Sequence, residues 1–299
     1  MENASKSHKI SVVVPVYNEA GAVGDTLKAI SDTLTARNIE HEIIAVNDGS
    51  HDQSETILNG LRIPHLTVIH HPENRGYGSS LKTGIKAAQY PWILITDSDG
   101  TYPIDRIPDL VEHLDNYDMV VASREKNGEQ KVHDTLPRKI GRGLVRWFAS
   151  YVTGHKIKDI NSGMRIFKKE DAERFWHLFP EGFSFTTTIT VASHNHGNTI
   201  KYVPVDYFKR SGVSSIKPAK DFVGFMSLIM RLAVYYKPLR VFVPISIILL
   251  GLALVVLFGS WIFLGRILDS TFAILAIASL QTLFFGMIAE MIVKRFYRE

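Results

Sequence analysis

The chain has no cysteine among its 299 residues. This absence excludes disulfide bonds, thiolate metal sites and cysteine nucleophiles. The sequence also has neither a G-x-G-x-x-G nor a G-x-x-x-x-G-K-[ST] pattern, so it supports neither a dinucleotide-binding fingerprint nor a P-loop. The formal net charge is only +4 at pH 7, which is too small to indicate a nucleic acid partner. The polar first residues lead directly into a predicted strand, so we expect no secretory signal and a cytoplasmic location for most of the chain.

Charged residues are missing from two long stretches, 244–264 and 270–288. Each stretch is close to the length that a helix needs to cross the hydrocarbon core of a membrane. We therefore expect membrane spans at about 241–264 and 270–293, joined as a hairpin by the short linker 265–269. A pair of buried core helices is the alternative, but uncharged runs of this length are typical of membrane spans.

Basic residues predict the orientation of this hairpin. They flank the outer ends of the two spans at Lys237, Arg240, Lys294, Arg295 and Arg298. Only Arg266 lies in the linker between the spans. By the positive-inside rule, we expect an integral protein of the cytoplasmic (inner) membrane, with the domain before the hairpin and both termini in the cytoplasm.

Apolar runs alternate with amphipathic helices in the part of the chain before the hairpin. The runs KISVVVPVY, HEIIAVNDGS, LTVIHH and PWILITDSDG predict strands. The first intervening helix carries apolar residues at helical spacing, namely Val23, Leu27, Ile30 and Leu34. This alternation indicates an α/β fold with a parallel sheet covered on both faces.

Polar clusters follow the predicted strands at the points where the strands end. They are Asn18-Glu19, Asn47–Ser50, Asn74–Gly76 and Asp97–Asp99. Ligands of parallel sheets bind at these carboxyl ends. Residues i and i+2 of an extended chain project to the same side, so we expect Asp97 and Asp99 to face one divalent cation. The sequence therefore predicts a binding site that contains a metal at this edge of the sheet.

After Ala122 the alternation ends, and two amphipathic helices are predicted at about 135–152 and 219–238. Each has an apolar face and basic flanks, which favours a location in the membrane interface. Ordinary core-packing helices are the alternative. We therefore divide the chain into a cytoplasmic domain at 1–218, which includes the first of these helices, a juxtamembrane helix at 219–238 and a hairpin at 239–299.

These motifs resemble those of the polyprenyl-phosphate glycosyltransferases of glycosyltransferase family 2. The matching segments are VVVPVYNE, VNDGSHDQS, NRGYGSSLKTG, TDSDGTYP, ASR, DINSGMRIFKKE, GFSFTTTIT and YFKRSGVSSI, followed by the paired apolar segments. The resemblance covers nearly the whole chain. It implies a Rossmann-like GT-A domain that binds a UDP- or GDP-sugar and transfers the sugar to a polyprenyl phosphate, such as undecaprenyl or dolichyl phosphate. It also implies a homo-oligomer, since relatives form tetramers.

For the donor, the resemblance implies a Mg²⁺ or Mn²⁺ ion held by Asp97 and Asp99, because hard cations take oxygen ligands and bridge phosphates. Helix capping by Asp99 is the alternative. Family members often have glutamine at the position of Thr101, so water or a phosphate oxygen would replace a third protein ligand. The implied contacts to the nucleotide sugar are Pro15, Tyr17, Asn18, Glu19, Asp48, Arg75, Asp97 and Ser98. Asp48 has a plainer interpretation as a turn residue before Gly49, and Asn47, where many relatives have aspartate, leaves the base open.

For the acceptor, the resemblance implies Ser123, Arg124 and Arg138 at the positions that hold the lipid phosphate, and guanidinium groups suit a phosphate. Each arginine could instead be a solvated surface charge. Arg210 matches the residue that reaches the donor diphosphate or the acceptor phosphate, and it joins Asp97 and Asp99 as an implied catalytic residue. The donor-sugar pocket is implied at Ser162, Gly163, Thr186 and Thr187.

The acceptor determines the mechanism. A phosphate oxygen is already a nucleophile, so we expect in-line attack on the anomeric carbon with inversion and without a dedicated base.

Two other functions remain open. A family 2 enzyme that acts on a hydroxyl acceptor would need a base, for which Asp159 is the best candidate. A non-enzymatic membrane scaffold or lipid carrier could also retain the fold.

Overall fold

The computed structural model describes residues 8–126, 129–130, 136–182, 184–208, 218–265 and 268–296. The chain divides into two compact units. One unit comprises Met1–Ser150 and His155–Phe225, and the other comprises Tyr151–Gly154 and Met226–Glu299.

The first unit contains a seven-stranded sheet with the order β3-β2-β1-β4-β8-β5-β9. Its strands are β1 (Ile10–Val16), β2 (His41–Asp48), β3 (Leu66–His71), β4 (Trp92–Ile95), β5 (Met119–Ser123), β8 (Arg165–Lys168) and β9 (Ile200–Pro204). The short strands β6 (Glu125–Lys126) and β7 (Glu129–Gln130) pair with each other. The four strands predicted from the sequence are all present.

The predicted parallel sheet is wrong in one respect, because β8 runs antiparallel to both of its neighbours, β4 and β5. The other neighbouring strands of the seven-stranded sheet pair in parallel. Apolar composition does not show the direction of a four-residue strand, so this feature was not visible in the sequence. As a consequence, the first residue of β8, Arg165, pairs with the last residue of β4, Ile95.

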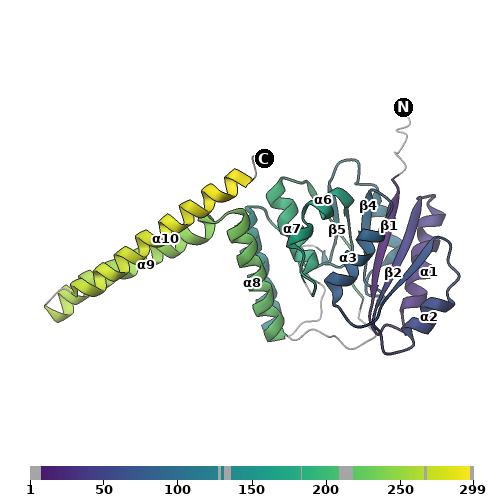
Figure 1. Cartoon of the computed structure of the whole chain (residues 1–299), viewed down its shortest axis with the longest axis horizontal. Helices are drawn as coiled ribbons and strands as arrows, with labels where there is room; N and C mark the ends of the chain where they lie inside the picture. Colours follow the sequence, from purple (N-terminus) through teal and green to yellow (C-terminus); the bar gives the residue numbers. More distant parts are fainter. Residues whose placement is uncertain are drawn as a thin grey trace. The chain divides into compact units, whose positions relative to one another are not determined.

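Helices cover both faces of the sheet, and Figure 1 shows β1, β2 and β4 between α1 and α3. The helices of the first face are α1 (Val23–Ala36), α2 (Ser54–Gly60) and α4 (Ile107–Val111), the last preceded by the 3-10 turn η1 (Ile104–Arg106). Those of the second face are α3 (Tyr77–Ala87) and α7 (Phe185–His196). The short elements α6 (Lys169–Arg174) and η2 (Trp176–Leu178) follow β8.

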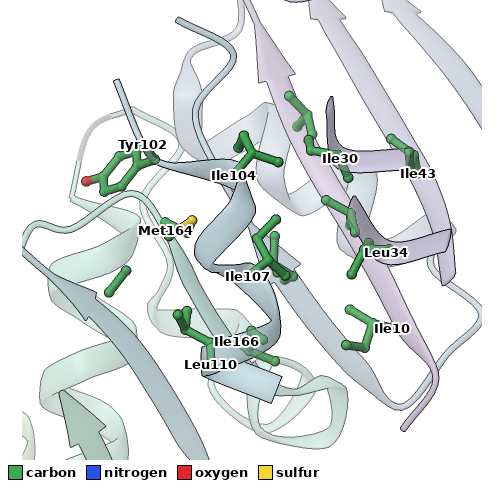
Figure 2. Packing of buried hydrophobic residues seen from close by; sticks show 14 of the residues in the cluster. Ile10, Ile30, Leu34, Ile43, Tyr102, Ile104, Ile107, Leu110, Met164 and Ile166 are labelled. Carbon is green, nitrogen blue, oxygen red and sulfur yellow. The ribbon is translucent and has the colours of Figure 1, made fainter. Parts of the chain in front are cut away.

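The core of the first face confirms the helical spacing predicted for α1. Val23, Leu27, Ile30 and Leu34 are fully buried. In Figure 2, Ile30 and Leu34 of α1 lie near Ile10 of β1 and Ile43 of β2, in one cluster. Full burial of such a side chain stabilises the fold by about 1.5–3 kcal/mol. This cluster therefore holds β1 and β2 in place, and with them the polar loops that follow these strands.

The second unit is dominated by two long apolar helices, α9 (Leu239–Leu264) and α10 (Asp269–Phe296). Both are long and apolar enough to cross a membrane by length and composition, with mean hydropathies of 3.0 and 2.1 over an 18-residue window of each helix. They run side by side in opposite directions (Figure 1). Their contact includes a reciprocal pair of hydrogen bonds in which the hydroxyls of Ser246 and Ser279 each donate to the other's backbone carbonyl at 2.9 Å. Hydroxyls paired in this way leave no unsatisfied donor against lipid.

Two further helices occur where the sequence predicted amphipathic segments. They are α5 (Leu136–Thr153) and α8 (Pro218–Tyr236). Within the second unit, the last turn of α5 is capped by basic side chains. Lys237 donates to the carbonyl of Thr153 at 2.9 Å, and Arg240 donates to the carbonyls of Tyr151 and Val152. Cations at a helix C-terminus satisfy its unpaired carbonyls and its dipole, so these basic residues tie α5 to the start of α9.

The contact between α3 and β1 can be tested at Gly84, where an added Cβ would lie 2.3 Å from Cγ1 of Val13. We expect Gly84→Ala to lower the free energy of unfolding by about 1–3 kcal/mol through overpacking, measured as a lower melting temperature of the detergent-solubilised protein. The matched control is Gly143→Ala in α5, where no atom lies within 4 Å of the added Cβ and a helical alanine is favoured. A melting temperature for Gly84→Ala at or above that of Gly143→Ala would contradict this packing.

Candidate active site

The loops that follow β1 and β2 are joined by hydrogen bonds at the carboxyl end of the sheet. The backbone N–H of Asn18 donates to Ser50 Oγ at 3.0 Å, and the N–H of His51 donates to Asn18 Oδ1 at 2.8 Å. The N–H of Glu19 donates to Ser54 Oγ at 2.9 Å. Asn18 has a φ of 55°, a left-handed conformation that asparagine adopts more readily than most residues. These hydrogen bonds therefore fix the loop after β1 against the loop after β2, and both loops contain predicted nucleotide contacts.

Tyr17 and Pro15 lie on either side of the end of β1. Tyr17 is 38% exposed, and its ring stands edge to face with His51, with 6.4 Å between the ring centroids. The carbonyl of Pro15 accepts a hydrogen bond from the buried Ser98 hydroxyl at 3.0 Å. Ser98 therefore ties the loop after β4 to β1, and Tyr17 offers an accessible aromatic surface beside that junction.

Asp48 organises the loop at residues 74–76. Its side chain is buried. Oδ1 accepts from His71 Nδ1 at 2.7 Å and from the N–H of Arg75 at 3.0 Å, while Oδ2 accepts from the N–H of Gly76 at 2.8 Å. The next residue, Gly49, has a φ of +65°, and an added Cβ would lie 2.5 Å from the backbone of Glu73. Asp48 thus has a structural role in the site, and its contact with a nucleotide stays a prediction.

Both aspartates lie beyond the end of β4, and Asp99 lies in a bend. Strand β4 ends at Ile95, and the chain bends at 98–100, where Gly100 has a φ of 71°. The spacing argument for residues i and i+2 therefore does not apply here. Oδ1 of Asp99 accepts from both the N–H and the hydroxyl of Thr101, at 3.1 and 2.6 Å, so Asp99 stabilises its own turn.

Asp97 is held between two neighbours from other elements. The hydroxyl of Tyr77, the first residue of α3, donates to Oδ1 of Asp97 at 3.1 Å. Burial and the Asp97 charge raise the pKa of Tyr77 well above its ordinary value, so this hydroxyl stays protonated and acts as the donor. On the other side, an added Cβ on Gly163 would lie 2.3 Å from Oδ2 of Asp97. Only glycine at this position leaves room for the carboxylate.

Asp97 and Asp99 supply carboxylate oxygens, which are the ligands that a hard divalent cation prefers, and their role as metal ligands stays a prediction. Among the residues that the structure describes, no group of three or more His, Cys, Asp or Glu side chains could hold a metal ion. A Mg²⁺ or Mn²⁺ ion at Asp97 and Asp99 would therefore complete its shell with phosphate oxygens and water, as Mg²⁺ commonly does in phosphate-transferring sites. The residues present fit this kind of cation and not a closed protein cage.

Arg124 and Asp159 form a buried, bidentate ion pair. Arg124 Nε donates to Oδ2 and Nη2 donates to Oδ1, each at 2.8 Å, and the Arg124 N–H donates to Oδ2 at 3.1 Å. The guanidinium also lies 5.4 Å from the centroid of the Tyr207 ring. Burial by itself would raise the pKa of Asp159, but the charge and hydrogen bonds of Arg124 hold it below its ordinary value. The pair keeps Arg124 in one orientation next to Ser123, which is buried at the end of β5.

The predicted sugar-pocket residues come together around the start of β8. The Ser162 hydroxyl donates to the carbonyl of Ala122 at 2.5 Å, and the N–H of Gly163 donates to the hydroxyl of Tyr102 at 2.6 Å. The Thr187 hydroxyl donates to Asn161 Oδ1 at 2.7 Å. The hydroxyls of Ser162 and Thr187 thus join the segments around the start of β8, and their contact with a sugar stays a prediction.

Thr186 contributes its backbone carbonyl, which accepts from the buried side chain of Arg165 at 3.0 Å.

Three residues of this region were not predicted from the sequence, namely Tyr77, Tyr102 and Arg165. Arg165 carried a usable signal, because an arginine inside an apolar strand run is rarely buried without a specific partner. The two tyrosines had no such signal, since their partners come from distant segments.

The three other predicted arginines are Arg75, Arg138 and Arg210. Arg210 lies outside the described residues. Arg138 belongs to α5, but its side chain is outside the described part of the structure. Arg75 is exposed at the surface of the loop that Asp48 holds through the Arg75 backbone.

The role of Asp48 can be tested with Asp48→Asn. In either orientation, the amide NH₂ of the new asparagine would face a backbone N–H, of Gly76 on one side or of Arg75 on the other. Two hydrogen-bond donors would then face each other in a buried position. We expect the free energy of unfolding to fall by about 1–3 kcal/mol, measured by chemical denaturation. The control is Asp32→Asn on the exposed side of α1, and equal stability of the two variants would contradict the structural role of Asp48.

A mixed sheet with polar loops at the carboxyl ends of β1, β2 and β4 is the GT-A-like architecture of nucleotide-sugar glycosyltransferases. Residues 11–176, more than half of the 299-residue chain, match the family model described as "Glycosyl transferase family 2". The chain belongs to this family.

Relatives agree with this membership, and a solved structure shares the fold. The chain is 28% identical over 215 residues to a dolichyl-phosphate hexose transferase of Haloferax volcanii, covering 70% of this chain and 87% of the relative. It is 27% identical over 265 residues to a bactoprenol glucosyl transferase of Shigella phage SfV, covering 87% of this chain and 82% of the relative. In fold, it is similar to the glucosyl-3-phosphoglycerate synthase of Mycobacterium tuberculosis in complex with Mn²⁺, UDP and phosphoglyceric acid. That match has a TM-score of 0.57 at 17% identity and covers 76% of this chain and 78% of the other.

Proposed function

We propose that the protein transfers a sugar from a UDP- or GDP-sugar to a polyprenyl phosphate, such as undecaprenyl or dolichyl phosphate, with inversion at the anomeric carbon. The product would be a polyprenyl-monophosphate sugar for the assembly of cell-envelope glycans or glycoproteins. Two relatives named for transfer to dolichyl phosphate or bactoprenol support this class of acceptor. One of these matches extends over 265 residues, 87% of this chain.

One structural observation supports a phosphate over a hydroxyl as the acceptor. A hydroxyl nucleophile needs a carboxylate to remove its proton, and Asp159 is the best candidate for that base. Asp159 is buried, both of its oxygens are bound by Arg124, and its pKa is lowered. A carboxylate with a lowered pKa that is already bound by two guanidinium donors is a poor proton acceptor. A phosphate acceptor avoids this requirement.

The donor would bind at the carboxyl ends of β1, β2 and β4. Asp97 and Asp99 would hold Mg²⁺ or Mn²⁺, which supplies positive charge to the leaving diphosphate when it is bound. The nucleotide would contact residues of the joined loops and of the bend after β4, namely Pro15, Tyr17, Asn18, Glu19, Asp48, Arg75 and Ser98. The sugar would lie against Ser162, Gly163, Thr186 and Thr187.

The acceptor phosphate would be held by Ser123, Arg124 and Arg138, with Arg210 at the donor diphosphate or the acceptor phosphate. A phosphate oxygen attacks the anomeric carbon and forms the new C–O bond. The bond between that carbon and the diphosphate oxygen breaks, and the diphosphate leaves with the electron pair. No proton has to be removed from the nucleophile. The ion pair with Asp159 fixes the plane of the Arg124 guanidinium, so this donor is oriented before the lipid arrives.

The membrane part of the proposal rests on α9 and α10 and on the distribution of basic residues. We infer a hairpin that spans the cytoplasmic membrane, with the catalytic domain and both termini in the cytoplasm. We also infer the division into a domain at 1–218, a juxtamembrane helix at 219–238 and a hairpin at 239–299. Association of hairpins into a homo-oligomer, a tetramer by resemblance, belongs to the same proposal.

The metal role predicts that Asp99→Ala and Asp99→Asn each reduce sugar transfer by at least about a hundredfold. The asparagine variant retains an oxygen for the turn with Thr101 but lacks the charge, so it separates folding from metal binding. The measurement is transfer of radiolabelled sugar from a panel of UDP- and GDP-sugars to polyprenyl phosphate, with Asp32→Ala on α1 as the control. Unchanged turnover in Asp99→Asn would remove the metal role.

The acceptor class predicts a clear difference between polyprenyl phosphate and the corresponding polyprenol. Purified protein in detergent should glycosylate the phosphate and leave the alcohol unmodified, because the structure offers no suitable base at Asp159. The glycolipid is identified by mass spectrometry after incubation with the accepted nucleotide sugar. Comparable transfer to the polyprenol would favour a hydroxyl-acceptor mechanism instead.

A further inference from the structure

We propose that Arg165 is a positioning residue that holds the Ile160–Gly163 segment against the carboxylate of Asp97. This proposal rests on the proposed function and adds a residue to it, because Asp97 belongs to the proposed metal and diphosphate site. Arg165 does not touch the reacting atoms in this proposal. It acts through the backbone of the segment that precedes β8.

Arg165 is fully buried, and its guanidinium connects two separate segments. On one side, Nε and Nη2 donate to the carbonyl of Ser162 at 3.1 and 2.5 Å, and Nη2 donates to the carbonyl of Ile160 at 3.3 Å. On the other side, Nη1 donates to the carbonyl of Thr186 at 3.0 Å and to Thr190 Oγ1 at 2.7 Å. The planar guanidinium can serve all these acceptors at once, whereas a lysine ammonium has three donors around one atom.

The acceptors of these bonds are all neutral oxygens. The carboxylate of Asp159 is bound bidentately by Arg124 and not by Arg165. Burying a cation without a directly paired anion carries a substantial desolvation penalty, and burial lowers the pKa of Arg165. Apolar packing would be a less costly way to fill this volume. A requirement for accurate placement of the Ile160–Gly163 segment explains why an arginine is found here.

The segment that Arg165 holds determines the space available to Asp97. Because β8 is antiparallel to β4, Arg165 pairs with Ile95, and Gly163 precedes it on the side of Asp97. The Gly163 N–H donates to Tyr102 at 2.6 Å, and an added Cβ on Gly163 would lie 2.3 Å from Asp97 Oδ2. A small shift of this backbone would therefore move the carboxylate, and small displacements of this kind are costly in sites that depend on geometry.

The test is the Mn²⁺-dependent binding of UDP, with GDP in parallel, to the full-length protein in detergent, measured by isothermal titration calorimetry. We expect Arg165→Lys to weaken this binding at least about tenfold and to raise the KM for the donor, while the KM for polyprenyl phosphate stays within about twofold. Gly163→Ala should have the same effect, because its Cβ displaces Asp97 directly. The double variant should bind the nucleotide no more weakly than the single variant with the lower affinity, since both changes act on one contact.

The matched control is Arg174→Lys. Arg174 lies at the end of α6, beyond the opposite end of β8, where it is bonded to Asp171 and His196. The Arg174→Lys variant should bind the nucleotide with Mn²⁺ as tightly as the unchanged protein does. If Arg165→Lys does not fold, Thr190→Val removes one bond to the guanidinium and should weaken binding in the same direction by a smaller factor.

Several outcomes would overturn the proposal. One is a folded Arg165→Lys or Thr190→Val variant with a lower melting temperature but unchanged Mn²⁺-dependent nucleotide affinity, since that would indicate a purely structural role. Full additivity of Arg165→Lys and Gly163→Ala would also contradict a shared contact. A failure of the proposed function is distinguishable, because the unchanged protein would then bind the nucleotide with Mn²⁺ but transfer no sugar to polyprenyl phosphate.

Discussion

Strand β8 runs antiparallel between β4 and β5, so its first residue, Arg165, pairs with the last residue of β4. This direction brings Gly163 beside Asp97 at the carboxyl end of the sheet. It also places Asp159, a few residues earlier, against Arg124 at the end of β5. Were β8 parallel, the same residues would begin at the opposite edge of the sheet. The composition of the site therefore depends on one strand direction.

Buried charge is the second constraint on this region. Arg165 is fully buried and Arg124 is largely buried, and the carboxylate of Asp159 is directly paired with Arg124. Because the pKa of Asp159 is lowered in the folded state, its contribution to stability is present above its ordinary pKa. It is lost as the pH falls through the lowered folded value. Tyr77 and Tyr102 have raised pKa values because they are buried, so they add hydroxyl groups without adding further charge.

The second unit follows different physical rules. Most side chains of α9 and α10 are exposed although they are apolar, an arrangement that suits a lipid environment better than water. The polar groups between the two helices are satisfied internally by the Ser246 and Ser279 pair. Lys237 and Arg240 combine a topological signal with a structural task, because they also cap the last turn of α5. The positions of these two basic residues therefore serve both the predicted orientation of the hairpin and the capping of α5.

The sequence by itself determined the existence and class of the elements. Strands β1 to β4, the buried face of α1, and the two apolar helices each follow from a local pattern of apolar residues, and the polar loops follow from where those patterns stop. Only the tertiary structure decided the direction of β8, the internal use of Asp48 and the pairing of Arg124 with Asp159. It also brought Tyr77, Tyr102 and Arg165 into the site. These features depend on contacts between residues that are distant in the chain, and a local periodicity contains no information about such partners.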